Sequence, residues 1–214
     1  MPNHITNRLR ITNVEPEQAK AFWKSIADEP FEDGSPCLID FNKIMPMPPT
    51  LMIECSSRAE EGLKLHKMRL AGIEFDEKQS ELIKDDPKLL ELGRQAFENL
   101  RDYGHRDWYD WCRSNWGTKW NAYDQTRIDD NTIEFLTAWC GVSDLMRTLS
   151  EQNPDACLEY MYADENWSCN VGQYEFQNGD TIYANEPEDM SEEAEEIACE
   201  LLGDYDCEEE GEEM

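Results

Sequence analysis

The sequence predicts an α+β fold: an antiparallel sheet with two helices on one face, a large mainly helical insertion, and a C-terminal hairpin followed by an acidic helix. The order of the elements is the first reason. With residues 30–119 set aside, the chain reads strand, helix, strand, strand, helix, strand, which is the split β-α-β or ferredoxin-like arrangement. Composition is the second reason. Seven Trp, eight Tyr and seven Phe supply large groups for a core, and no apolar run is long enough to span a membrane.

In the N-terminal half, the pattern of apolar residues changes several times between the strand period and the helical period. Residues 5–12 alternate apolar and polar side chains, which is typical of a half-buried strand. Residues 16–26 place apolar side chains at helical spacing behind a proline, which suits a first turn. Residues 30–55 are rich in proline and therefore irregular. Helical spacing returns in residues 57–70 and 87–103, so the insertion is predicted to be mainly helical.

Turn and stop signals place the remaining elements. Asn178-Gly179 is the strongest hairpin signal of the chain, and Gly203 ends the last helix. Residues 204–214 are almost wholly acidic and are expected to be disordered. The elements predicted here are strands over 120–127 and 132–139, a helix over 143–152, strands over 157–163, 172–177 and 181–184, and a helix over 188–202. The predicted domains are a sheet domain of residues 1–29 and 120–187, an insertion of residues 30–119, and an acidic helix over 188–203.

The charge of the chain is large and uneven. Forty-eight Asp and Glu stand against nineteen Lys and Arg, which gives a net charge of −29. Arg147 is the last basic residue, and the 67 residues after it carry 22 acidic side chains. A chain this acidic is not expected to bind duplex DNA directly, because that binding needs a basic surface. The charge serves either solubility or a cationic partner.

Catalytic and metal-binding patterns are missing from the sequence. Eight Cys show no Cys-x-x-Cys spacing and there are three His, so we expect no metal site and no cofactor. His105 and Cys112 are two helical turns apart, too far for direct contact on a straight helix. We therefore expect that this protein is not an enzyme. The first residues lack an apolar segment of signal-peptide length, which favours a reducing compartment and free thiols.

Four stretches of the first 165 residues together resemble the YubB-like family. They are NRLRIT at residues 7–12, DFNKIMPMP at 40–48, NWGTKWNAY at 115–123 and TAW at 137–139. Members of this family are phage and conjugative-plasmid proteins with a C-terminal ferredoxin-like domain. The resemblance implies a mobile-element origin and a location in the host cytoplasm, and it implies no catalytic residue.

The predicted C-terminal helix is the first candidate functional surface. At a rise of ~1.5 Å per residue it carries one carboxylate per ~3 Å, close to the ~3.4 Å phosphate spacing of a DNA strand. An apolar stripe that includes Met190 and Ile197 would anchor it on the sheet. We expect it to mimic DNA and to inhibit a basic host nucleic-acid-binding protein, of anti-restriction or anti-CRISPR type; the alternative is a solvated face. The predicted partner-binding residues are Glu188, Asp189, Glu192, Glu193, Glu195, Glu196 and Glu200, with Asp164, Glu165 and Glu175 of neighbouring strands.

A second hypothesis places function in the Asn115–Trp120 block. Indoles beside polar side chains can stack on a base or a cation, which predicts a pocket for a small ligand or single-stranded nucleic acid. The alternative is that Trp116 and Trp120 only seal the insertion onto the sheet. The candidate pocket residues are Asp40, Asn42, Trp116, Lys119, Trp120, Tyr123 and Trp139. In either case we expect a monomer or small homo-oligomer.

Overall fold

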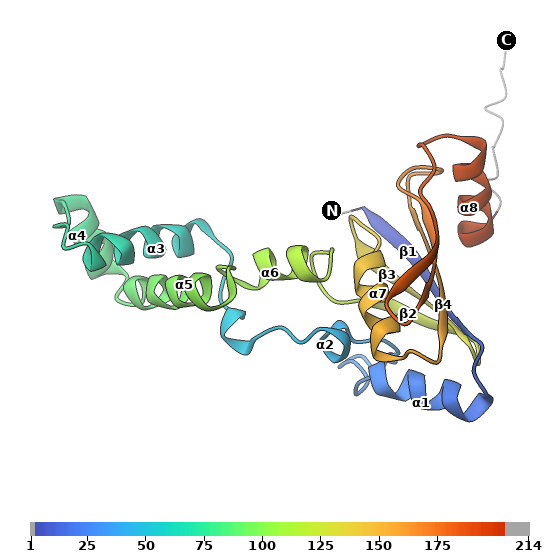
Figure 1. The fold of residues 1–214 in the computed structure, drawn as a ribbon. Coiled ribbons are helices and arrows are strands. Elements are labelled where there is room, and N and C mark those ends of the chain that lie inside the picture. Colours follow the sequence, from blue (N-terminus) through green and yellow to red (C-terminus); the bar gives the residue numbers. More distant parts are fainter. Residues whose placement is uncertain (1–2, 204–214) are drawn as a thin grey trace, which may run out of the picture. The chain divides into compact units, whose positions relative to one another are not determined.

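The computed structural model describes residues 3–203 and divides the chain into two compact units (Figure 1). Residues 46–115 form one, here called the helical unit, and the residues on both sides of it form the other, here called the sheet unit. None of the described helices is both long and apolar enough to cross a membrane. The predicted disorder of residues 204–214 falls outside the described part of the chain.

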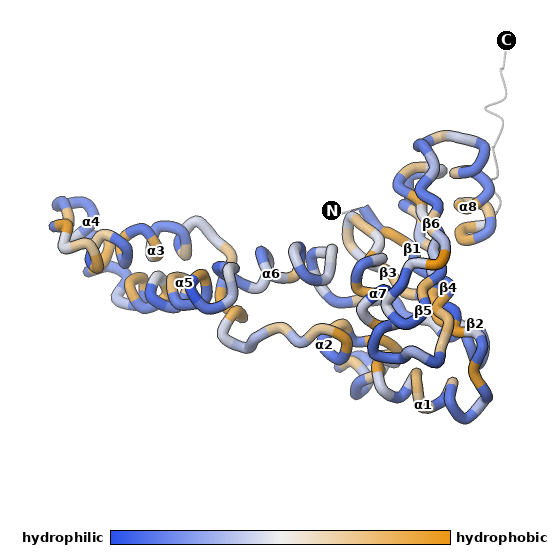
Figure 2. Tube along the Cα trace, viewed as in Figure 1, coloured by the Kyte–Doolittle hydropathy of each residue, from blue (hydrophilic) through white to orange (hydrophobic). Residues whose placement is uncertain are grey.

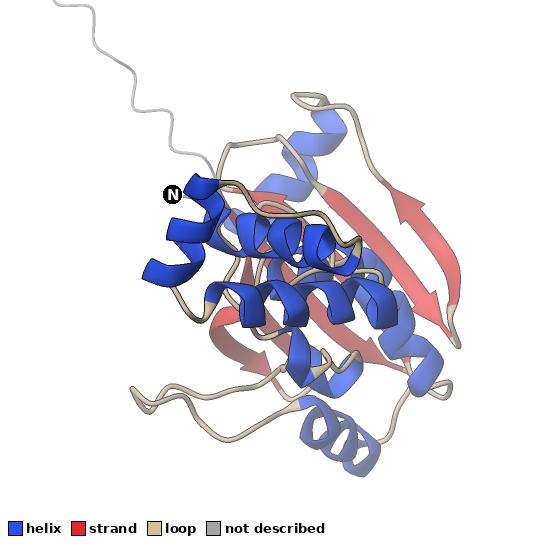
Figure 3. Ribbon diagram, turned by 90° about the vertical axis from the view of Figure 1, so that its left-hand side faces the viewer, coloured by secondary structure: helices blue, strands red, loops and turns tan. Residues whose placement is uncertain are grey.

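The described part of the sheet unit contains one six-stranded antiparallel sheet (Figure 3). Its strand order is β2-β3-β1-β4-β5-β6. The first four strands in this order reproduce the split β-α-β arrangement, and the hairpin β5-β6 extends the sheet beyond β4. The predicted topology is therefore confirmed. The strands are β1 (His4–Thr12), β2 (Tyr123–Asp129), β3 (Thr132–Ala138), β4 (Cys157–Asp164), β5 (Gly172–Gln177) and β6 (Asp180–Asn185).

One face of this sheet is covered by a layer of three helices, α1 (Pro16–Ile26), α2 (Phe41–Ile44) and α7 (Ser143–Gln152). Alternate residues of β1, such as Leu9, point into this layer and are fully buried. A polar network crosses the same core. The hydroxyl of Tyr160 donates to Asn7 Oδ1 at 2.6 Å and accepts the N–H of Val142 at 2.7 Å. Because Asn7 and Tyr160 are buried, these bonds satisfy groups that water cannot reach.

The opposite face of the sheet carries α8 (Glu192–Leu202). Met161 and Ala163 of β4 have the opposite parity to Tyr160, and they pack against this helix instead of the helical layer. On α8 the buried side chains recur at helical spacing, so hydrophobic and hydrophilic positions alternate along its turns (Figure 2). The buried residues of α8 are Ala194, Ile197, Ala198 and Leu201.

The helical unit rests on a close helix pair. Helices α3 and α5 pack through Gly62 and Gly93, where a Cβ on Gly93 would lie 1.9 Å from the carbonyl oxygen of Gly62. Only glycine at this position lets the two backbones approach so closely. The helix α4 buries none of its residues. The elements of this unit are η1 (Pro49–Leu51), α3 (Ser57–Leu70), α4 (Glu77–Asp85), α5 (Leu89–Tyr103) and α6 (Trp108–Asn115).

The boundaries between the units differ from the predicted insertion of residues 30–119. Residues up to 45 belong to the sheet unit, because the N–H groups of Leu38 and Ile39 donate to Gln125 Oε1 at 2.6 and 2.8 Å. The ring of Phe41 also contacts Phe135 of β3, with centroids 6.0 Å apart. At the other end, Trp116 already belongs to the sheet unit. The helical unit is therefore shorter than the sequence predicted.

Candidate functional site

The acidic helix begins later than its sequence predicted. The hydroxyl of Ser191 accepts the N–H of Ala194 at 3.1 Å, so the N-cap lies at Ser191. Glu188 and Asp189 precede the helix, and Met190 is 75 % exposed in a left-handed turn, so its predicted place on the apolar stripe was wrong. Helix α8 itself carries five of the seven predicted carboxylates.

Those five glutamates form one continuous surface, here called the acidic ridge: Glu192, Glu193, Glu195, Glu196 and Glu200. All five are exposed. At ~100° per residue they fall within about 160° of the helix circumference, opposite the buried stripe. From Glu192 to Glu200 the helix rises ~12 Å, which again gives one carboxylate per ~3 Å. The ridge is therefore fixed to the sheet by its buried side and presents its charges on one side.

Few cations compensate the acidic ridge. Among the ion pairs of the described residues, one reaches it: Arg8 Nη1 lies 3.9 Å from a carboxylate oxygen of Glu200 and donates to its carbonyl oxygen at 3.3 Å. Arg8 is shared with Glu134, whose carboxylate accepts from Nε at 2.8 Å. A cation at a helix C-terminus stabilises the helix, so Arg8 attaches the end of α8 to the sheet and leaves the other four glutamates uncompensated.

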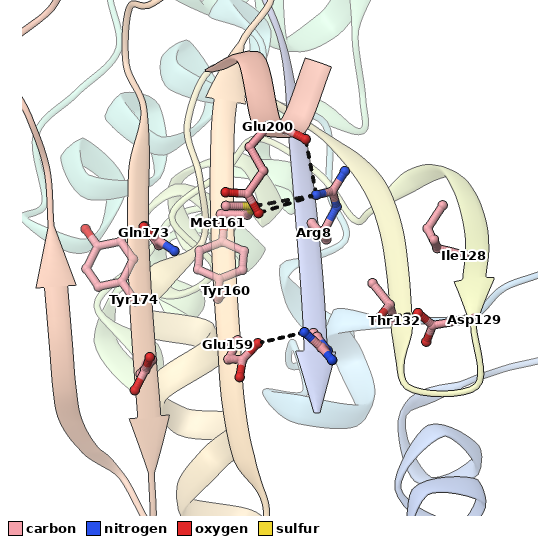
Figure 4. A pocket seen from close by; sticks show the side chains of 12 residues that line it. Arg8, Ile128, Asp129, Thr132, Glu159, Tyr160, Met161, Gln173, Tyr174 and Glu200 are labelled. Carbon is pink, nitrogen blue, oxygen red and sulfur yellow. Dashed lines mark hydrogen bonds and ion pairs between the residues drawn. The ribbon is translucent and has the colours of Figure 1, made fainter. Parts of the chain in front are cut away.

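The ridge continues into an open groove of about 520 Å³ on the same face of the sheet. Figure 4 shows Arg8, Met161 and Glu200 at the end of the groove beside α8. Farther along, Glu175 stands opposite Glu159, which pairs with Arg10 at 3.5 Å. The predicted residue Glu175 therefore lies on the face that carries α8, where it adds to the negative charge.

Trp167 lies beside the acidic ridge. Its half-buried ring packs against the residues under α8, and it lines a shallow depression together with Cys199 and four of the five glutamates. An indole surrounded by carboxylates can contact a cationic side chain by charge and through its ring. Trp167 was not predicted from the sequence, because its neighbours on α8 are 25 or more residues away.

Asp164 is the clear error among the predicted partner-binding residues. It is 4 % exposed, and its carboxylate accepts hydrogen bonds from the side-chain amides of Asn3 and Asn170 and from the N–H of Asn166. A carboxylate held in this way has a structural role and is not available to a partner. The next residue, Glu165, is exposed at the end of β4.

The predicted pocket residues separate into two groups. Asp40, Asn42 and Trp116 belong with the helical layer. Asp40 caps α2 by accepting the N–H of Asn42 at 2.9 Å and also accepts from Asn121 at 2.6 Å. Trp116 is 4 % exposed, donates to the carbonyl of Met45 and contacts the ring of Phe41. These three residues hold the 40–45 segment in place.

The other four residues meet at one end of the sheet and form what is here called the aromatic corner: Lys119, Trp120, Tyr123 and Trp139. Lys119 Nζ lies 4.3 Å from the ring centroid of Trp120 and 5.2 Å from that of Trp139. The rings of Trp120 and Tyr123 meet edge to face. His4, which sequence reasoning missed, joins the corner because its Nδ1 lies 2.7 Å from the Tyr123 hydroxyl.

Metal-ligating side chains do not cluster in the described chain, and His105 and Cys112 have separate partners. Among residues 3–203 no group of three or more His, Cys, Asp or Glu could hold a metal ion. In the helical unit, His105 Nε2 lies 3.5 Å from the side-chain amide of Asn115, whereas the Cys112 thiol lies 3.9 Å from the Met47 sulfur. Burial raises the pKa of Cys112 to about 12, which keeps it a neutral thiol.

Comparison with known proteins concerns the fold. No curated protein sequence matches this chain. Among solved structures, the chain is similar to the crystal structure of a protein api92 from Yersinia pseudotuberculosis, with a TM-score of 0.38 and 11 % identity over 87 % of this chain and 98 % of that chain. Residues 115–210 match the family model described as the ferredoxin-like domain in Api92-like protein. The resemblance to the YubB-like family stays a prediction. The chain therefore contains a ferredoxin-like domain, and its residues 115–210 are similar to the one in Api92-like protein.

Proposed function

We propose that this chain is a non-enzymatic accessory protein whose acidic ridge binds a basic nucleic-acid-binding protein and blocks its nucleic-acid site. The partner class in view is a host defence protein, such as a restriction or CRISPR effector. The observation that carries the proposal is the fixed, one-sided arrangement of the ridge. Five carboxylates at ~3 Å spacing can occupy a cationic groove in place of a few consecutive phosphates.

The surroundings of the ridge support a specific contact over simple solvation. The apolar stripe that packs α8 on the sheet also fixes the side on which its charges face outward. Trp167 adds an aromatic contact at the edge of the ridge, and aromatic anchors are frequent in the energetically important part of interfaces. The resemblance to phage and plasmid proteins supports the rest of the proposal, which places the chain in the cytoplasm of a bacterial host.

The exposed groove beside α8 does not favour single-stranded nucleic acid as the ligand. Sheets that bind RNA stack bases on aromatic side chains of their open face. Here the corresponding central positions of β1 are Arg8 and Arg10, and each is already paired with a glutamate. Base stacking has no platform at this position.

The test is competition with DNA. A panel of purified restriction nucleases, CRISPR effectors and other basic DNA-binding proteins is mixed with labelled duplex DNA, and fluorescence anisotropy follows DNA release as this chain is added. We expect at least one panel member to release DNA, with an affinity that falls more than tenfold between ~0.05 and ~0.5 M NaCl.

A neutralised ridge supplies the matched comparison. Changing Glu192, Glu193, Glu195 and Glu196 together to Gln should weaken inhibition by more than tenfold, while circular dichroism shows an intact fold. The control makes the same change in charge on exposed residues of the helical unit: Glu74, Glu77 and Glu81 to Gln, and Asp85 to Asn. Equal inhibition by the two variants, or no DNA release from any panel member, would reject the proposal.

A further inference from the structure

The aromatic corner already contains a cation. The ammonium group of Lys119 lies near two indole rings, 4.3 Å from the centroid of Trp120 and 5.2 Å from that of Trp139. All three side chains are half-buried, so the arrangement is formed by the fold yet is reachable from solvent. Indole faces attract ammonium and guanidinium groups, and paired aromatic rings are a common way to recognise a cation.

The backbone of Trp139 is held by two separate segments of the chain. Its backbone N–H donates to the carbonyl of Asn3 at 3.0 Å, and its backbone carbonyl accepts from the side-chain amide of Asn170 at 3.1 Å. The amides of Asn3 and Asn170 both also donate to the buried carboxylate of Asp164. Asp164 therefore fixes the two asparagines that bond the backbone of Trp139, which is a structural role for this buried carboxylate.

Left-handed backbone also occurs at the aromatic corner. Trp139 has a φ of +74°, a left-handed conformation that is costly for an aromatic residue. Asp124, Ser168 and Asn170 are also left-handed, at +46°, +52° and +46°. Strain of this kind persists where surrounding contacts over-determine the backbone, and it gathers at sites of function. The left-handed Trp139 directs its ring toward Lys119 in place of the core.

The local charge favours a cationic ligand over an anionic one. Burial raises the pKa of the Tyr123 hydroxyl, and the nearby carboxylates of Asp124 and Glu165 raise it further. These carboxylates would repel a phosphate group. Lys119 is the basic residue in contact with the indoles, and its charge is already directed at the rings.

We propose that Trp120 and Trp139 form a binding site for an arginine side chain of a partner, and that Lys119 is an internal occupant that the arginine displaces. Arginine is the expected ligand because its planar guanidinium stacks on an indole and is more weakly hydrated than an ammonium. The site uses none of the ridge residues, and it rests on the proposed function only in that the partner is basic.

The test titrates small ligands while following the indole N–H signals of Trp120 and Trp139 by NMR, assigned with W120F and W139F. N-acetyl-L-arginine methylamide is the cationic probe, its citrulline counterpart is the uncharged control, and thymidine 5′-monophosphate is the anionic probe. We expect the arginine probe alone to shift both signals. Removing the occupant in K119A should lower the Kd of this probe about fivefold, the value of one exposed cation–π contact.

Further variants keep the result interpretable. K119Q should also tighten binding, which covers the case in which K119A fails to fold. K20A removes an equally positive but distant charge and should leave the Kd unchanged. Repeating the titration with the neutralised ridge separates this site from the proposed function. Unchanged or weaker arginine binding in K119A and K119Q, binding of the nucleotide instead, or no shift with any probe would overturn the proposal.

Discussion

The sheet unit and the helical unit use their acidic residues in opposite ways. Residues 46–115 contain 14 acidic and 11 basic side chains, a net charge of −3, whereas the rest of the sequence contains 34 acidic and 8 basic side chains, a net charge of −26. More than half of the basic residues of the protein thus lie in one third of its length. The acidity is therefore a property of one unit, not of the whole chain.

Ion pairing follows the same division. In the helical unit Arg58 lies 2.5 Å from Asp86 and 2.9 Å from Glu54, and Arg94 reaches both Glu91 and Glu98. On the acidic ridge, within the described residues, the single pair is the distant one between Arg8 and Glu200. Arginine pairs thus compensate many carboxylates of the helical unit, whereas four of the five glutamates of the acidic ridge have no ion pair within the described residues. A purely solubilising role would not require that one unit keep nearly all of the charge.

The substitution Gly93→Ala should produce the largest difference in stability between the two units. The new Cβ would meet the carbonyl of Gly62 at 1.9 Å, a backbone clash that neither helix can relieve by a rotamer change. We expect α3 and α5 to separate, at a cost of more than about 3 kcal/mol in the helical unit. Hydrogen exchange with mass spectrometry should show lost protection in both helices and unchanged protection in the sheet.

Gly104→Ala is the matched control. Gly104 follows α5 at a φ of +75° with no atom within 4 Å of a new Cβ, so the substitution costs about 1 kcal/mol of backbone strain without a clash. Its α3 and α5 peptides should stay protected. If Gly93→Ala also exposes β1 and β4, the two units do not unfold independently and the comparison fails.

The complementary substitution destabilises the sheet unit. Tyr160→Phe removes the hydroxyl that satisfies both Asn7 and Val142, and the two partners stay buried. We expect a loss of about 2 kcal/mol in the stability of the sheet unit, since an unsatisfied buried polar group costs about 1–3 kcal/mol. Urea unfolding followed by hydrogen exchange should show the loss in β1 and β4 but not in α5.

Tyr183→Phe makes the same chemical change at a side chain on β6 that is 44 % exposed. Its effect on stability should be within about 0.5 kcal/mol, because the hydroxyl faces water. Equal losses of stability in Tyr160→Phe and Tyr183→Phe would show that the buried hydrogen bonds of Tyr160 do not stabilise the sheet unit.

The fold was predictable where one period dominated. Apolar residues recur with the strand period in β1 and with the helical period in α1 and α7. These patterns predicted the bounds of the three elements to within a residue or two. Helix α4 was missed because it buries none of its residues; its signal is the capping box between Asp76 and Gln79. The start of α8 was placed too early because acidic residues continue through a turn that Ser191 ends.

The candidate site was harder to predict because its contacts are long-range. The sequence shows that Asp164 is a carboxylate, but the amides that bury it come from Asn3, 161 residues away, and from Asn170. Trp139 was selected for its residue type, and its contact with Lys119 depends on how two separate segments meet at the end of the sheet. Side-chain pattern predicts which face of an element is buried, and it does not predict which distant residue covers it.

The smallest expected effect is the part of the acid dependence that comes from the pairs of Arg58 in the helical unit. The Arg58 guanidinium lowers the pKa of Asp86, and hydrogen bonds from Ser56 and Arg58 lower the pKa of Glu54. A carboxyl whose pKa is lower in the folded chain stabilises the fold above its ordinary pKa and loses that contribution as pH falls through the folded value. The contribution should therefore be complete at pH 6 and decline below about pH 4.

The substitution Arg58→Gln isolates this contribution. Because the groups are exposed, we expect a small decrease in thermal midpoint relative to the unsubstituted protein at pH 6, and the difference should close as the pH falls below about 4. Lys84→Gln removes one exposed positive charge that has no ion pair among the described residues, and its midpoint difference should be smaller at pH 6. A difference for Arg58→Gln that persists unchanged to pH 2.5 would mean that the arginine acts through the packing of its stem, and the ion pairs would then not be what distinguishes the helical unit from the sheet unit.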